Sequence, residues 1–99
     1  MSDPRVELAW DGRTVRIEHR FIAGPADAPL LVFLHEGLGS VSMWRDFPDR
    51  LCTATGTRGL VYSRPGYGRS SPHAGPLAPD FMHRQAQELL PALLDALQI

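Results

Sequence analysis

The stretch Leu30-Leu31-Val32-Phe33-Leu34-His35-Glu36-Gly37-Leu38-Gly39-Ser40 decides how this chain folds. Its five leading apolar residues predict a strand that is buried on both faces, as in the middle of a parallel sheet covered by helices. The strand ends at His35 and opens into glycines just before a region that favours a helix. Such an arrangement directs backbone N–H groups at one point, where they can hold an anion or an oxyanion. We therefore expect this segment to support chemistry.

Length and composition restrict what the rest of the chain can be. Its 99 residues predict one domain over positions 1–99, and the net charge of −1, with acids and bases interspersed, argues against nucleic acid or a membrane surface as a partner. Cys52 is the single cysteine, so no internal disulfide can form. Residues 1–5 lack the features of a signal peptide, and the apolar run 30–34 is far shorter than the ~20 residues of a membrane helix. A cytoplasmic location is the expectation.

The first part of the chain predicts a β-hairpin. Residues 6–10 and 14–22 read as strands, and they flank Asp11-Gly12-Arg13, which has the composition of a tight turn. Val15, Ile17, His19 and Phe21 share one face of the second strand at a period of two.

Strands and helices alternate after residue 30. We expect a helix over 42–55 with Pro48 in its first turn or at a break, a buried strand over 59–63, a long loop over 64–79 and an amphipathic helix over 80–99 that is kinked at Pro91. The expected apolar face of the last helix consists of Met82, Ala86, Leu89, Leu90, Leu93 and Leu97. This alternation predicts an α/β fold with a mostly parallel sheet, whose ligands bind at the carboxyl ends of the strands.

Two motifs resemble the N-terminal part of an α/β-hydrolase-fold enzyme. They are the segment 35–40, followed by Trp44, and the segment 62–70, Tyr-Ser-Arg-Pro-Gly-Tyr-Gly-Arg-Ser. The family usually has His-Gly-x-x-Gly-Ser and Asp-x-x-Gly-x-Gly-x-Ser, so Glu36 stands in place of Gly and Ser63 in place of Asp. The resemblance covers roughly positions 6–97 and implies a partial α/β-hydrolase sheet, with an antiparallel hairpin followed by parallel strands and flanking helices.

The resemblance also implies roles for single residues. Gly37 is expected to offer its backbone N–H to an oxyanion hole, and Leu38 and Trp44 to line the substrate pocket. His35 and Glu36 are expected to support the loop, although Glu36 could equally face the pocket or the solvent. No metal or other cofactor is expected, because the four histidines of the sequence lack metal-ligand spacing.

The serines of this sequence lie outside any Gly-x-Ser-x-Gly context, which is the nucleophile elbow of the family. The resemblance therefore implies an incomplete domain that is inactive alone. The family chemistry is hydrolysis of an ester, an amide or a related small-molecule substrate by a serine nucleophile. An apolar strand at 30–34 without its neighbour would also favour self-association, or pairing with a complementing C-terminal polypeptide.

Two alternatives remain open from the sequence. One is an interaction module without catalysis. The other is an NADP-type dinucleotide site, because Gly37-Leu38-Gly39 partly matches the Gly-x-Gly-x-x-Gly pattern and Ser63-Arg64 ends the next strand. Ser42 occupies the position of the third glycine, however, and no acidic residue ends the second strand.

Overall fold

A computed structural model describes residues 5–10, 12–35, 39–72 and 79–99. Its strands are β1 (Arg5–Trp10), β2 (Arg13–Ile22), β3 (Leu30–Phe33) and β4 (Arg58–Tyr62). They form one mixed sheet in the order β1-β2-β4-β3, in which β3 and β4 are parallel and the other pairs are antiparallel. The predicted α/β arrangement of a hairpin followed by parallel strands is confirmed, but the described strands form a mixed sheet and not a mostly parallel one.

The hairpin of β1 and β2 forms around the predicted turn. Trp10 pairs with Arg13, and Gly12 between them has a φ of 75°, a left-handed conformation that glycine adopts without steric cost. β2 is ten residues long and extends beyond β1. Its last four residues pair with β4, with His19 opposite Tyr62 and Ile22 opposite Gly59. One strand therefore joins the hairpin to the parallel part of the sheet.

The connection from β3 to β4 is not the single helix over 42–55 that the sequence predicts. A 3₁₀ turn η1 (Ser42–Trp44) comes first, and α1 (Phe47–Thr55) follows it. Arg45 separates the two with a φ of 54°, which a continuous helix cannot contain. Pro48 lies in the first turn of α1, where its missing N–H would have no helical partner in any case.

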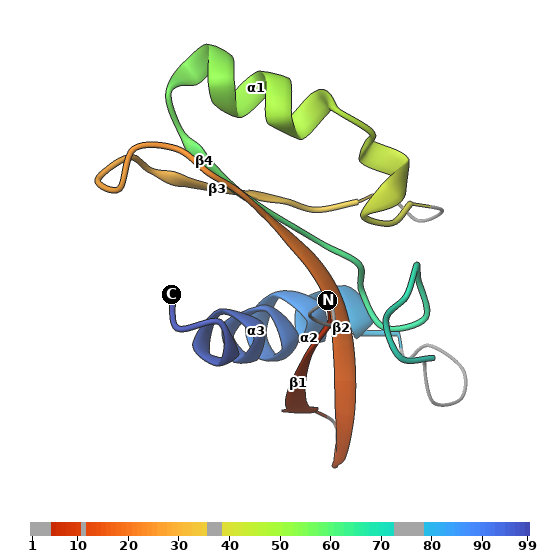
Figure 1. Ribbon diagram of the computed structural model, residues 1–99. Helices are drawn as coiled ribbons and strands as arrows, with labels where there is room; N and C mark the ends of the chain where they lie inside the picture. Colours follow the sequence, from red (N-terminus) through yellow and green to blue (C-terminus); the bar gives the residue numbers. More distant parts are fainter. Residues whose placement is uncertain (1–4, 11, 36–38, 73–78) are drawn as a thin grey trace.

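Helices cover both faces of the sheet. Figure 1 shows α1 on one side and the C-terminal helices on the other. Two hydrophobic clusters fill the two interfaces, and each joins strand residues to one helical layer. The cluster under α1 contains Ile22, Phe33, Cys52 and Val61; the cluster under the C-terminal helices contains Leu8, Trp10, Val15, Ile17, Tyr62, Leu89 and Leu93.

The C-terminal helical segment differs from the prediction. It consists of α2 (Phe81–Arg84), a π-helical turn η2 (Gln85–Leu89) and α3 (Leu90–Ala96). The irregularity thus precedes Pro91, which has no N–H to donate to the carbonyl group of residue 87 and crowds the preceding turn. No helix within the described ranges is long and apolar enough to cross a membrane.

The π-helical turn also changes which side chains face the sheet. Leu89 and Leu93 are buried as predicted, but the prediction is wrong for Met82, which is 56% exposed, and for Ala86, which is exposed. Gln85 is buried instead. A π-helix has more residues in each turn than an α-helix, so the face before Leu89 is rotated relative to the α-helical pattern.

Truncation of Leu89 tests this packing. Leu89 is fully buried, so we expect Leu89→Ala to lower the free energy of unfolding by about 2 to 5 kcal/mol. Met82→Ala, the matched control on the same segment, should change it by less than about 0.5 kcal/mol because the side chain is exposed. Urea unfolding followed by circular dichroism measures both, and equal losses would contradict the observed face.

Candidate functional site

The glycine segment, residues 34–41 between β3 and η1, is hydrogen-bonded at both ends to two consecutive residues that follow β4. The backbone N–H of Arg64 donates to Nε2 of His35 at 2.9 Å, and the N–H of Val41 donates to Oγ of Ser63 at 2.8 Å. Because Nε2 of His35 accepts a hydrogen bond, it cannot carry a proton in this arrangement. The end of β4 therefore holds both ends of the glycine segment.

The Tyr67 ring lies against the His35 ring, and the Arg64 guanidinium group lies over the Tyr67 ring. The rings of His35 and Tyr67 lie 4.8 Å apart, and the Arg64 guanidinium group lies 5.1 Å from the centre of the Tyr67 ring. His35 is only 6% exposed. The imidazole thus sits between the end of β3 and the loop after β4, and its contacts restrict its orientation.

A buried polar network lies behind Ser63. The Ser63 hydroxyl group donates to Oε1 of Glu18 at 2.8 Å, and the backbone N–H of Arg69 donates to the same oxygen at 3.1 Å. Ser70 connects the two residues again, because its hydroxyl group donates to the Ser63 carbonyl at 2.6 Å and accepts from the Glu18 N–H at 2.9 Å. These bonds tie the loop after β4 to the middle of β2.

Gly68 lets the loop approach this network closely. Its φ is 52°, and a Cβ atom built on it would overlap Oε1 of Glu18 and lie 2.6 Å from Oγ of Ser63. A larger residue would therefore displace the buried carboxylate as well as strain the backbone.

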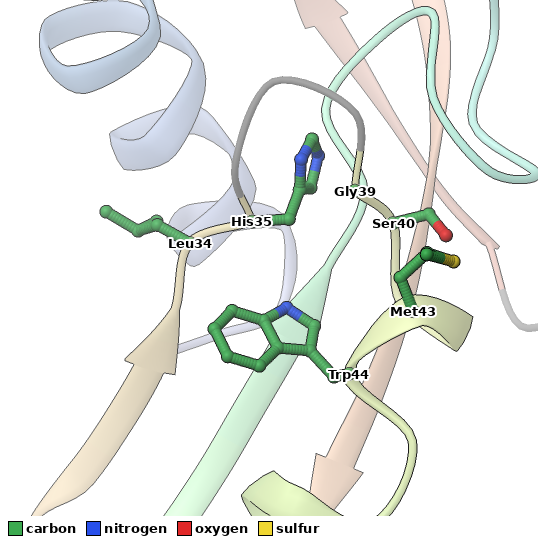
Figure 2. Close-up of a pocket in the computed structure, with 6 residues that line it drawn as sticks. All are labelled: Leu34, His35, Gly39, Ser40, Met43 and Trp44. Atoms are coloured by element: carbon green, nitrogen blue, oxygen red, sulfur yellow. The ribbon is translucent and has the colours of Figure 1, made fainter.

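A pocket of about 330 Å³ opens beside the glycine segment, lined by Leu34, His35, Gly39, Ser40, Met43 and Trp44. Figure 2 shows that Leu34 and His35 project in different directions from the end of β3 and that Trp44 comes from the turn after the loop. The Trp44 ring is held edge-on to Phe33 at 5.6 Å and stacked on Phe47 at 6.1 Å. The walls are mostly apolar, and the volume suits a small organic molecule.

A smaller hollow of about 110 Å³ lies on the side of the C-terminal helices. Leu34 and His35 line it as well, together with Tyr62, Arg64, Met82, Gln85, Ala86 and Leu90. Burial raises the pKa of Tyr62 above its usual value, and the nearby Arg64 charge opposes this in part. The end of β3 thus borders a hollow on each side of the sheet.

The structure brings two of the predicted site residues together. His35 and Trp44 both line the larger pocket. Gly37, Leu38 and Glu36 lie outside the described residues. In the ranges that the structure describes, no group of three or more histidine, cysteine, aspartate or glutamate side chains could hold a metal ion.

Glu18 and Ser70 were not expected at the site. The sequence marks Ser63 as a departure from the usual aspartate and as part of Ser63-Arg64, but its hydrogen-bond partner lies 45 residues earlier in the chain. The available signal was an acidic residue inside β2 on the same face as Ile22, a core residue.

Comparison with solved structures identifies the architecture, although no family model matches the chain. A hydrolase from Pseudomonas aeruginosa is 29% identical, with a TM-score of 0.67 over 96% of this chain. Est816, described as an N-acyl homoserine lactone degrading enzyme, is 22% identical, with a TM-score of 0.67 over 94% of this chain. The chain has part of an α/β-hydrolase fold. It spans about a third of each of these proteins, 33% and 32% of their lengths.

Substitution of Gly68 tests how closely the hydrolase-fold loop packs on the buried carboxylate. Gly68→Ala should lower the free energy of unfolding by about 2 to 4 kcal/mol, through backbone strain and overpacking together. Gly12→Ala is the matched control, because Gly12 also has a positive φ but has open space around its Cβ position. Its loss should be about 1 kcal/mol. Chemical denaturation of both variants gives the comparison, and equal losses would exclude the packing contribution.

Alkaline unfolding tests the burial of Tyr62. Because burial raises its pKa in the folded state, the unfolded chain releases this proton first, and stability should fall as the pH rises above about 10. Below that pH the residue should make no pH-dependent contribution. We expect Tyr62→Phe to flatten the decline in urea midpoint between pH 9 and 11. An unchanged slope would show that the hydroxyl group is not desolvated.

Proposed function

We propose that this chain forms the oxyanion and substrate-pocket side of a serine hydrolase that acts on esters, amides or related small substrates. The observation that carries the proposal is the pocket at the carboxyl end of β3, beside a glycine segment whose two ends are hydrogen-bonded to Ser63 and Arg64. Donors that are held in place before the reaction stabilise developing negative charge without reorganisation. This is the property that an oxyanion hole needs.

Within the proposal, the backbone N–H of Gly37 donates to the oxyanion. Leu38 and Trp44 form the wall against the acyl or alcohol group, and His35 and Glu36 support the loop. The mostly apolar pocket suits an acyl substrate. N-acyl homoserine lactones, which Est816 degrades, belong to this class.

The proposal needs a nucleophile from polypeptide outside these 99 residues, since no serine of the sequence stands in a Gly-x-Ser-x-Gly turn. The outer edge of β3 offers the place for it. Among the described residues β3 pairs only with β4, and the side chain of Leu34 beside this edge is 60% exposed. A parallel strand along this edge would turn alternate side chains toward the two hollows that meet at Leu34 and His35.

We propose that the occupant of this edge is a strand of hydrolase polypeptide, because the matched hydrolases are about three times longer than this chain. Pairing of two copies of the chain through β3 is the competing outcome. Sedimentation of the chain with and without the remaining two-thirds of the Pseudomonas hydrolase distinguishes a mixed complex from a homodimer.

The two alternatives make different demands. A pure interaction module would bind through the β3 edge and need no donor at Gly37. A dinucleotide site would give a thermal shift with NADP, and the structural matches to hydrolases lend it no support.

A fusion protein tests the proposal. Residues 1–99 are joined to the remaining two-thirds of the Pseudomonas hydrolase, and hydrolysis of p-nitrophenyl butyrate is measured. We expect the fusion to be active and the 99-residue chain alone to be inactive. Gly37→Pro, which removes the N–H, should lower kcat by about 100- to 1,000-fold relative to Gly37→Ala, which retains it.

Circular dichroism and thermal unfolding of both variants establish that each fusion is folded. Equal kcat values in two folded variants would show that the Gly37 N–H does not contribute to the reaction. If the fusion is active with that result, the hydrolase proposal stands and the assignment of Gly37 as oxyanion donor is wrong.

A further inference from the structure

Glu18 is a buried acid that the proposed chemistry does not use. It lies on β2, is 9% exposed, and accepts hydrogen bonds from Oγ of Ser63 at 2.8 Å and from the N–H of Arg69 at 3.1 Å. Burying a carboxylate is costly unless hydrogen bonds replace its water. A residue held at this cost is a candidate for a specific task.

The task follows from the proton of the Ser63 hydroxyl group. A serine hydroxyl group has one proton to donate and two lone pairs to accept with. The Ser63 hydroxyl group donates its single proton in the hydrogen bond to Oε1 of Glu18, so the lone pairs of Oγ remain to accept from another donor. The N–H of Val41 donates to that oxygen at 2.8 Å. The Glu18 carboxylate therefore orients the Ser63 hydroxyl group, and this orientation determines where Oγ accepts the hydrogen bond from the Val41 N–H.

Val41 lies at the end of the glycine segment, directly after Ser40, which lines the larger pocket. In the motif that this chain resembles, an aspartate usually stands at position 63, and its carboxylate could accept the Val41 N–H without an intermediary. Here a serine stands at that position, and its hydroxyl group donates to a carboxylate on the neighbouring strand, that of Glu18.

We propose that Glu18 is a positioning residue for the glycine segment, acting through the Ser63 hydroxyl group on the backbone of Val41. Its significance for catalysis rests on the proposed function. The chain of hydrogen bonds itself can be tested without any activity.

Amide hydrogen exchange of the 99-residue chain tests it. In Glu18→Met, which removes the acceptor but leaves the backbone bonds of residue 18 in place, the Val41 amide should exchange at least tenfold faster than in the unaltered chain. The amides of the β2–β4 ladder serve as the internal reference and should change by less than threefold. Glu7→Met is the matched control, because Glu7 is an exposed acid paired with Arg16 on the neighbouring strand pair, and Val41 should be unaffected.

A second substitution provides the rescue. Adding Ser63→Asp to Glu18→Met places a carboxylate directly opposite Val41, and we expect protection of its amide to return to within about threefold of the unaltered chain. Equal loss of protection at Val41 and in the ladder, or a folded double variant without rescue, would overturn the proposal. If Glu18→Met does not fold, the double variant decides: a folded chain with a protected Val41 supports it, and an unfolded chain overturns it.

These readouts separate the two proposals. A protected Val41 in an inactive fusion protein would contradict the proposed function and leave the role of Glu18 intact. An active fusion protein in which Glu18→Met leaves the exchange rate of the Val41 amide unchanged would support the proposed function and contradict the role of Glu18.

Discussion

Two hydrogen bonds at the end of β4, from Val41 to Ser63 and from Arg64 to His35, are the constraint on which the rest of the candidate site depends. Parallel pairing of β3 and β4, with Phe33 opposite Val61, brings the two following loops to the same edge of the sheet. Glycine has more accessible backbone conformations than other residues, so a sheet alone does not fix a loop that contains it. Hydrogen bonds at both of its ends reduce that freedom.

β2 carries a second constraint. It pairs with β1 over most of its length and with β4 over its last four residues, so it lies at the centre of both antiparallel ladders. The same strand places Glu18 behind Ser63 on one part of its surface and joins Arg20 to Asp49 of α1 by a 2.8 Å ion pair on another. β2 thus contacts α1, its neighbouring strands and the loop after β4.

The sequence predicts those parts of the structure whose causes are local. An Asp-Gly turn between two alternating segments predicts the hairpin, and apolar runs before glycines predict β3 and β4. The break at Arg45 is not visible in periodicity, because it is a departure from regular spacing. Pro91 predicts an irregularity in the last helix, but the apolar spacing does not show that it takes the form of a π-helical turn over Gln85–Leu89. The bond from Ser63 to Glu18 joins residues 45 positions apart, and it requires the strand order to be known first.

The most direct test of the proposed oxyanion site and substrate pocket is a crystal structure of the fusion protein with a covalent phosphonate ester on its nucleophilic serine. We expect a phosphonate oxygen to lie about 2.7 to 3.1 Å from the backbone nitrogen of Gly37. We also expect the attached acyl mimic to lie in the pocket lined by Leu34, His35 and Trp44. A phosphonate oxygen bound by donors outside the segment between β3 and η1, with the acyl mimic on another face, would contradict the proposal.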